Sequence, residues 1–189
     1  MNAIIYDESD NSIIISGRTQ GVVKLGNNNK VLWILGCHKD WGSAGNGTNL
    51  TNFLLQPLGK NKQPISSQDV LDGNSNHPDF EWNWYQHAPL LMSNGHLMLF
   101  DNGGENRNFT GLGQYSRAVE YAIDKTAKTV QQIWSYGKDR GVATFAHIIS
   151  DVDFLSSSNH VIFSSGAVAN GSNYGKVIEL DYCYTASGV

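Results

Sequence analysis

Short apolar runs separated by turn residues recur in the same order three times along the chain. Each copy opens with an apolar lead-in and continues with runs that are rich in Val, Ile, Tyr, Phe and Trp. Such runs fit the pleated, half-buried surface of a β-sheet, and no stretch keeps the apolar spacing of a helix. The pattern therefore predicts an all-β fold in which helix is a minor component. The predicted strands are residues 3–6, 12–16, 21–26 and 30–36, then 89–92, 96–100, 117–124 and 129–137, then 152–155, 160–164 and 176–181.

Clusters of Asn, Asp, Ser and Gly lie between the predicted strands, at residues 10–11, 27–29, 93–95 and 156–159. Asn, Asp and Gly tolerate the left-handed backbone that tight turns require. These clusters therefore predict hairpins between consecutive strands. The apolar run Ile13-Ile14-Ile15 indicates, in addition, a strand that is covered on both faces.

Four short strands in each copy, with turns between them, are typical of the blades of a β-propeller. Blade-like units are expected at about residues 1–36, 88–137 and 145–184, and the third lacks a fourth strand. Three units do not close a ring, and closure is what removes exposed sheet edges. We therefore interpret the chain as about three consecutive blades of a longer β-propeller, whose open edges predict self-association. The alternative is a complete small stack of sheets.

Two insertions, residues 37–86 and 101–116, interrupt the repeated pattern. Insertions of this length inside a compact fold are usually functional loops. The first ends in an aromatic cluster, Phe80-Glu81-Trp82-Asn83-Trp84-Tyr85, just before His87. This cluster predicts an apolar wall for an aromatic ligand, and ordinary packing of a long loop is the alternative.

Composition and charge argue against several classes of partner and site. The formal net charge is −4 and no basic cluster is present, so nucleic acid is not expected as a partner. No apolar run is long enough to span a membrane. Cys37 and Cys183 leave two alternatives open, a disulfide in an oxidising compartment or two free thiols. No Cys-x-x-Cys pair and no two His at ligand spacing occur, so no metal site is expected.

An ordered set of short segments resembles the bacterial arylsulfotransferases that do not use the nucleotide sulfate carrier. The similarity runs from about residue 2 to about residue 166, and these segments carry it: 10–18, 33–36, 84–87, 100–103, 115–121 and 133–141. The resemblance implies a six-bladed propeller that transfers a sulfuryl group from a phenolic sulfate ester to a phenolic acceptor. It also implies a sulfated histidine intermediate, no cofactor, and a periplasmic or secreted location.

The resemblance further implies roles for particular residues. His87 corresponds to a sulfate-contacting histidine and Arg107 to the arginine of the site, with Trp84 and Asn102 as substrate-binding residues. These residue types suit the chemistry, because Arg offers paired donors to sulfate oxygens and His can act as nucleophile near neutral pH. The nucleophilic histidine is expected on a later blade, where His147 is the nearby candidate. A strand-capping or packed histidine and a solvated loop arginine are the alternative interpretations.

The chain also departs from the family pattern. The family has a histidine just before the stretch that opens here with Met1-Asn2, and the spacing to Arg107 is longer. An incomplete ring without that histidine predicts that the isolated chain does not transfer sulfate. The alternative function is a non-catalytic propeller segment that binds an aromatic ligand or a protein partner.

Overall fold

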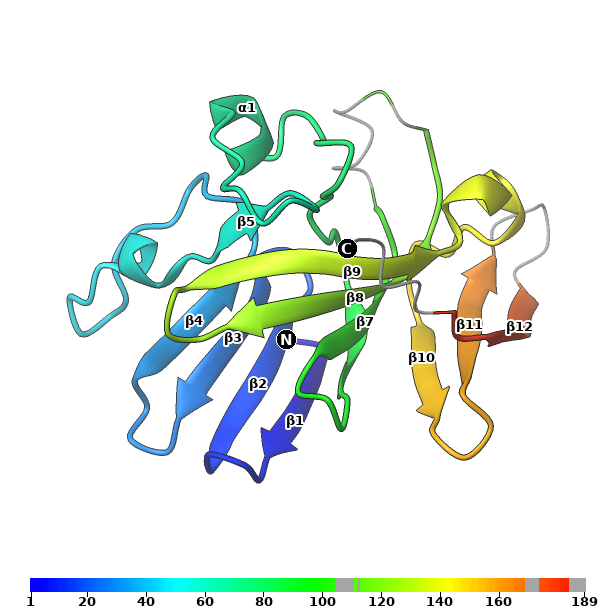
Figure 1. The fold of residues 1–189 in the computed structure, drawn as a ribbon, viewed down its shortest axis with the longest axis horizontal. Coiled ribbons are helices and arrows are strands. Elements are labelled where there is room, and N and C mark those ends of the chain that lie inside the picture. The colour runs from blue at the N-terminus through cyan, green and yellow to red at the C-terminus, as the bar shows by residue number, and fades with distance from the viewer. Residues whose placement is uncertain (105–110, 112, 169–173, 184–189) are drawn as a thin grey trace.

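The computed structural model describes residues 1–104, 111, 113–168 and 174–183. Its strands form three separate sheets and its helices are few and short (Figure 1). The all-β class predicted from the apolar pattern is confirmed. The described strands do not close into a ring, so the number of propeller blades stays a prediction.

The first sheet has four antiparallel strands in the order β1-β2-β3-β4. These strands are β1 (Ala3–Asp7), β2 (Ser12–Gly17), β3 (Gly21–Gly26) and β4 (Val31–Leu35). Asn11 and Asn29 have φ values of 54° and 61° in the turns of this sheet, as their predicted turn positions require. Ile14 is buried, whereas Ile13 and Ile15 are half-buried. The β2 strand is thus fully covered on one face only, and the prediction of two covered faces was wrong.

The second sheet has five strands in the order β5-β9-β8-β7-β6. These strands are β5 (Gln56–Leu58), β6 (His87–Leu91), β7 (Leu97–Asp101), β8 (Arg117–Asp124) and β9 (Thr129–Tyr136). Four of them form the expected antiparallel meander, and β5 pairs with β9 in parallel. The 37–86 insertion therefore adds an edge strand that the sequence pattern did not predict. The strand is only three residues long and has Pro57 at its centre, which suits an edge position.

The third sheet has three antiparallel strands in the order β10-β11-β12. These strands are β10 (Ser150–Leu155), β11 (His160–Val168) and β12 (Tyr174–Asp181). Asn159 has a φ of 58° in the turn between β10 and β11, at a predicted turn position. Along β12, half-buried residues alternate with exposed ones, as on a strand with one solvated face.

The five-stranded sheet lies between the other two and is buried on both faces (Figure 1). On β7, Leu97 and Leu99 join the apolar cluster shared with the first sheet, whereas Met98 and Phe100 join the cluster shared with the third. Successive side chains of a strand point to opposite faces, so a strand covered on both sides is apolar throughout. The two clusters hold the three sheets side by side.

The described residues of the two insertions meet near the start of β6, where the site is found. The first contains η1 (Leu50–Phe53) and α1 (Gln68–Leu71), and η3 (Lys138–Ala143) follows β9. Described ends of the two insertions touch: the N–H of Gly103 donates to the carbonyl oxygen of Trp84 at 2.9 Å. None of the helices in the described part of the chain is long and apolar enough to cross a membrane.

Candidate functional site

His87 begins β6 where the backbone departs from regular pairing. Tyr85 and Ala88, on either side of it, have φ values of 54° and 46°, and the pairing of β6 with β7 shifts after His87. Residues other than glycine rarely adopt such values, and surrounding contacts must hold them there. One such contact comes from the buried Gln86, whose Nε2 donates to the carbonyl oxygen of Gly17 at 2.9 Å. The imidazole is thus presented from a constrained turn.

Asn102 fixes which ring nitrogen of His87 carries the proton. The buried Asn102 amide donates through Nδ2 to the carbonyl oxygen of Ala146 at 2.6 Å and to Oγ of Ser150 at 3.1 Å. A carbonyl oxygen only accepts, so Oδ1 of Asn102 faces the other way, toward Nδ1 of His87 at 2.8 Å. Nδ1 therefore donates, and the carbonyl oxygen of Tyr85 is a second acceptor at 3.2 Å. In the neutral ring, Nε2 keeps an unprotonated lone pair.

A hollow of about 450 Å³, here called the His87 hollow, lies beside this imidazole. It is lined by Asn2, Ala3, His87, Ala88, Ile149, Ser150, Asp151, Ser164 and Gly166. Nε2 of His87 forms no hydrogen bond with any residue that the structure describes. A lone pair without a partner therefore stands next to space for a ligand.

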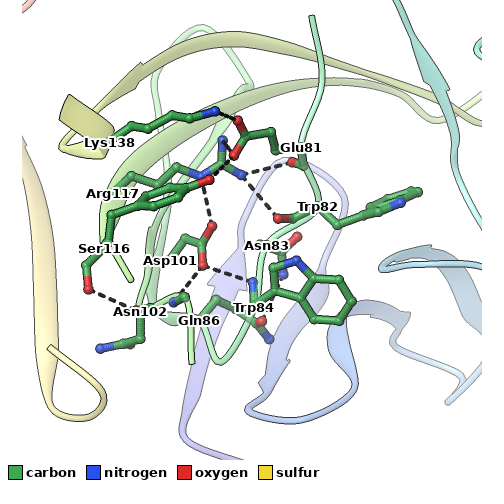
Figure 2. A network of polar contacts seen from close by, with 12 residues as sticks. Glu81, Trp82, Asn83, Trp84, Gln86, Asp101, Asn102, Ser116, Arg117 and Lys138 are labelled. Carbon is green, nitrogen blue, oxygen red and sulfur yellow. Dashed lines mark hydrogen bonds and ion pairs between the residues drawn. The ribbon is translucent and has the colours of Figure 1, made fainter. Parts of the chain in front are cut away.

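A buried ion pair anchors the aromatic segment that precedes His87 (Figure 2). Nε of Arg117 donates to Oδ2 of Asp101 at 2.8 Å. Nη2 of Arg117 donates to the carbonyl oxygens of Glu81 at 2.9 Å and Trp82 at 3.2 Å. Oδ1 of Asp101 accepts from the backbone N–H of Trp84 at 2.9 Å. The pair thereby fastens residues 81–84 to strands β7 and β8.

Glu81 is a second carboxylate in the same cluster. Its Oε2 lies 3.5 Å from Nη1 of Arg117 and accepts from the hydroxyl of Tyr115, and its Oε1 pairs with Lys138. Burial alone would raise the pKa of Glu81, but the charges of Arg117 and Lys138 and the Tyr115 hydrogen bond lower it to about 2. The charged groups of the cluster are paired with one another, and the cluster holds the segment that precedes His87 in place.

Trp84 lines a different hollow, of about 320 Å³, here called the Trp84 hollow. Cys37 and Trp41 line it as well, and Gly73 packs directly against the Trp84 ring. A Cβ at Gly73 would lie 2.7 Å from that ring, and its φ of 77° also favours glycine. Trp84 does not line the His87 hollow.

His147 lines a third hollow, of about 510 Å³, here called the Arg18 hollow. Its lining residues are Arg18, Tyr85, Gly104, Gln114, Val142, Phe145 and His147. The side chain of His147 is exposed and forms no hydrogen bond with a described residue. Its carbonyl oxygen accepts from Nη2 of Arg18 at 3.2 Å.

The predicted site residues are only partly brought together. His87 and Asn102 form a direct hydrogen bond, as shown above, whereas Trp84 and His147 each line a separate hollow. Arg107 lies outside the described residues. The four described residues therefore do not converge on one hollow.

Sequence reasoning did not single out Arg18 or the buried pair of Arg117 and Asp101. Both arginines stand in segments that carry the family resemblance, but an isolated arginine is normally solvated and gives no further signal. The signal for Arg117 is its position at the start of an apolar strand, followed by Ala118 and Val119. A charge at such a position needs a buried partner.

Neither cysteine is in a disulfide: Cys37 is a half-buried free thiol and Cys183 an exposed one. Burial raises the pKa of the Cys37 thiol. Within the described ranges, no group of three or more His, Cys, Asp or Glu side chains could hold a metal ion.

The chain is similar to known proteins along nearly its whole length. A family model described as Arylsulfotransferase (ASST) matches residues 1–187. Arylsulfate sulfotransferase AssT of Escherichia coli O6:H1 (strain CFT073) is 37% identical over 189 residues, which cover 96% of this chain and 30% of that protein. The protein of the same name from Lelliottia amnigena is 34% identical over 190 residues, with the same shares covered. The chain thus spans 30% of the length of each relative.

Proposed function

The chain belongs to the arylsulfotransferase family, and on that premise we propose that it forms part of an aryl sulfotransferase. The reaction moves a sulfuryl group from a phenolic sulfate ester to a phenolic acceptor through a histidine intermediate. We propose further that the three sheets are consecutive blades of a propeller. Their face-to-face packing across two apolar clusters supports this arrangement. The activity is proposed for the complete protein that carries these residues, because the chain spans 30% of its relatives' length.

The observation that carries the proposal is the fixed tautomer of His87. Asn102 and the carbonyl oxygen of Tyr85 both accept from Nδ1, so the Nε2 lone pair is available beside the His87 hollow. A nucleophilic imidazole needs such a bare nitrogen and a second group that orients the ring. His147 lacks the second feature, because its imidazole is exposed and no described residue orients it. The geometry therefore favours His87 over His147 as the residue that accepts the sulfuryl group.

The proposed transfer has two steps. In the first, the Nε2 lone pair of His87 forms a bond to sulfur while the bond from sulfur to the phenolic oxygen breaks, and phenolate leaves with the electron pair. The sulfated ring keeps its Nδ1 proton and is positively charged, and Asn102 Oδ1 stabilises that charge as an acceptor. In the second, a phenol oxygen bonds to sulfur, its proton passes to water, and the electron pair of the N–S bond returns to Nε2.

The remaining predicted residues have supporting roles in this proposal. Arg107 pairs with the sulfuryl oxygens, which carry negative charge throughout. Trp84 lines a neighbouring hollow and contacts a part of the substrate that lies away from sulfur, and His147 lines the Arg18 hollow. Replacing Arg107 by Ala in the complete protein should slow transfer by about a hundredfold or more.

The test is sulfate transfer from 4-nitrophenyl sulfate to phenol by the complete protein, followed as release of 4-nitrophenolate. His87→Ala should slow transfer by about a hundredfold or more, because the nucleophile is lost. Donor without acceptor should leave one sulfuryl group on the peptide that contains His87, detected by mass spectrometry. His160→Ala is the matched control, because this residue begins β11 at the turn and lines none of the three hollows.

Each outcome has a definite meaning. A folded complete protein that releases no 4-nitrophenolate contradicts the transferase proposal. If that protein binds the ester without turnover, the second candidate function holds, a non-catalytic segment for aromatic ligands. A sulfuryl group found on His147 instead of His87, together with full activity of His87→Ala, contradicts the assignment of the nucleophile.

A further inference from the structure

We infer that the Arg18 hollow is a binding site for an aromatic anion, with Arg18 as the cation and Tyr85 and Phe145 as its aromatic walls. The ligand that the proposed function supplies is an aryl sulfate, and the choice of sulfate rests on that function. The site is distinct from the His87 hollow, since the two share no lining residue.

The charge of Arg18 has no counter-ion among the described residues. No described Asp or Glu lies within ion-pair distance of Arg18. Arg117 is the opposite case, because it pairs with Asp101 and Glu81. A half-buried cation loses part of its hydration, and an anion in the adjoining space restores that stabilisation. Arg18 is therefore suited to bind a ligand, whereas Arg117 supports the fold.

Arg18 is also held in a fixed position. Its Cζ lies 5.1 Å from the centre of the Tyr85 ring, and its Nη2 donates to the carbonyl oxygen of His147 at 3.2 Å. Its Nε is buried and has no hydrogen-bond partner among the described residues. A guanidinium that is already oriented loses little freedom when it binds an oxyanion.

The walls of the Arg18 hollow select an aromatic anion over a bare one. Its volume of about 510 Å³ is within the range of small-molecule sites. The Tyr85 ring and the Phe145 side chain, together with Val142, supply apolar surface beside the cation. An aromatic ring covers this surface while its charged group reaches the guanidinium. A free sulfate ion lacks the first of these contacts.

Binding of 4-nitrobenzenesulfonate to the complete protein tests the inference, because its sulfur cannot be transferred. Calorimetry should show that Arg18→Met weakens binding by about ten- to a hundredfold, the loss of one charge-assisted contact. Arg140→Met is the matched control: its Cζ lies 5.2 Å from the Tyr136 ring and it lines no hollow described above. Arg140→Met should bind as the unaltered protein does.

A second pair of variants keeps the test independent of folding. Val142 lines the hollow and is 61% exposed, so a charge there does not disturb the core. Val142→Asp should weaken binding of the sulfonate and Val142→Lys should strengthen it. Inorganic sulfate and 4-nitrophenol should each bind more weakly than the sulfonate, and 4-nitrophenyl phosphate should bind comparably.

Equal binding by Arg18→Met and the unaltered protein, or equal binding by the two Val142 variants, overturns the inference. Failure of the proposed function is distinguishable from this result. If the protein binds the sulfonate through Arg18 but shows no transfer, the Arg18 site is supported and the proposed function is contradicted. If the protein transfers sulfate and the Arg18→Met variant still binds the sulfonate as well, the proposed function is supported and the Arg18 site is contradicted.

Discussion

Replacing Arg117 by Met should destabilise the fold more than any surface arginine substitution. The Arg117 side chain is 1% exposed and donates to Asp101, to the carbonyl oxygens of Glu81 and Trp82, and to Oε1 of Gln132. Met has a similar stem length but no donor and no charge. The substitution therefore removes all these bonds while filling most of the space.

The magnitude follows from what stays buried after the substitution. The carbonyl oxygen of Trp82 loses its Arg117 donor, whereas that of Glu81 keeps the hydroxyl of Tyr121 as a donor. Leaving a buried acceptor unsatisfied costs about 1–3 kcal/mol. Asp101 and Glu81 also lose the guanidinium between them, and removing one partner of a buried ion pair costs about 3–5 kcal/mol. These costs overlap, because one side chain causes both, so we expect a loss of about 4 kcal/mol in the free energy of unfolding.

Urea unfolding followed by tryptophan fluorescence measures this loss, with the slope of the transition compared between variants. Arg140→Met is the control, since Arg140 is exposed, and its loss should stay below about 1 kcal/mol. A loss for Arg117→Met as small as that of the control would refute the anchoring role. Asp101 also accepts from the N–H of Trp84 and so helps to anchor the segment that precedes His87. If Arg117 anchors this segment through Asp101, transfer activity of Arg117→Met should fall together with its stability.

Three further predictions concern titration, backbone strain and thiol reactivity. The pKa of Glu81 is about 2 in the fold against 4.5 ordinarily, so its stabilising contribution is complete above about pH 4.5 and is lost toward pH 2. Glu81→Gln should abolish the fall of the urea midpoint between about pH 4.5 and pH 2. An unchanged dependence of the midpoint on pH would contradict this role of Glu81. Gly137 has a φ of 117°, and a Cβ there would lie 2.5 Å from a carbonyl oxygen. Gly137→Ala should therefore lower stability by about 1–3 kcal/mol while Gly45→Ala changes it little, and equal effects in thermal unfolding would be inconsistent with this strain. A thiol reagent should modify exposed Cys183 well before Cys37, whose pKa is raised by burial, so equal rates would rule out this burial.

The strands and turns were predictable because their causes are local. Asn11, Asn29 and Asn159 stand at turns and adopt the left-handed backbone there, as their side chains allow. Short apolar runs such as residues 97–100 suit strands, because a sheet that is covered on both sides buries successive side chains on its two faces. Sequence neighbours alone determine these features.

Pairing between distant segments was not predictable in the same way. β5 joins the second sheet beside β9, although more than seventy residues separate Gln56 from its partner Thr129. A three-residue strand with proline at its centre has no periodic pattern, and its position is fixed only once the edge of β9 exists. Likewise, Ile13 and Ile15 are half-buried because of what packs against β2, which their own apolar character does not reveal.

The sequence determined the family and two residues of the site, since the segments that carry the resemblance include His87 and Asn102. The tertiary structure alone decided what those residues can do. The tautomer of His87 depends on the direction of the Asn102 amide, which a carbonyl oxygen forty-four residues away fixes. The charge of Arg18 is unpaired because no carboxylate of the described residues reaches it. Hydrogen bonding and ion pairing depend on atoms within a few ångströms, and the fold chooses those neighbours.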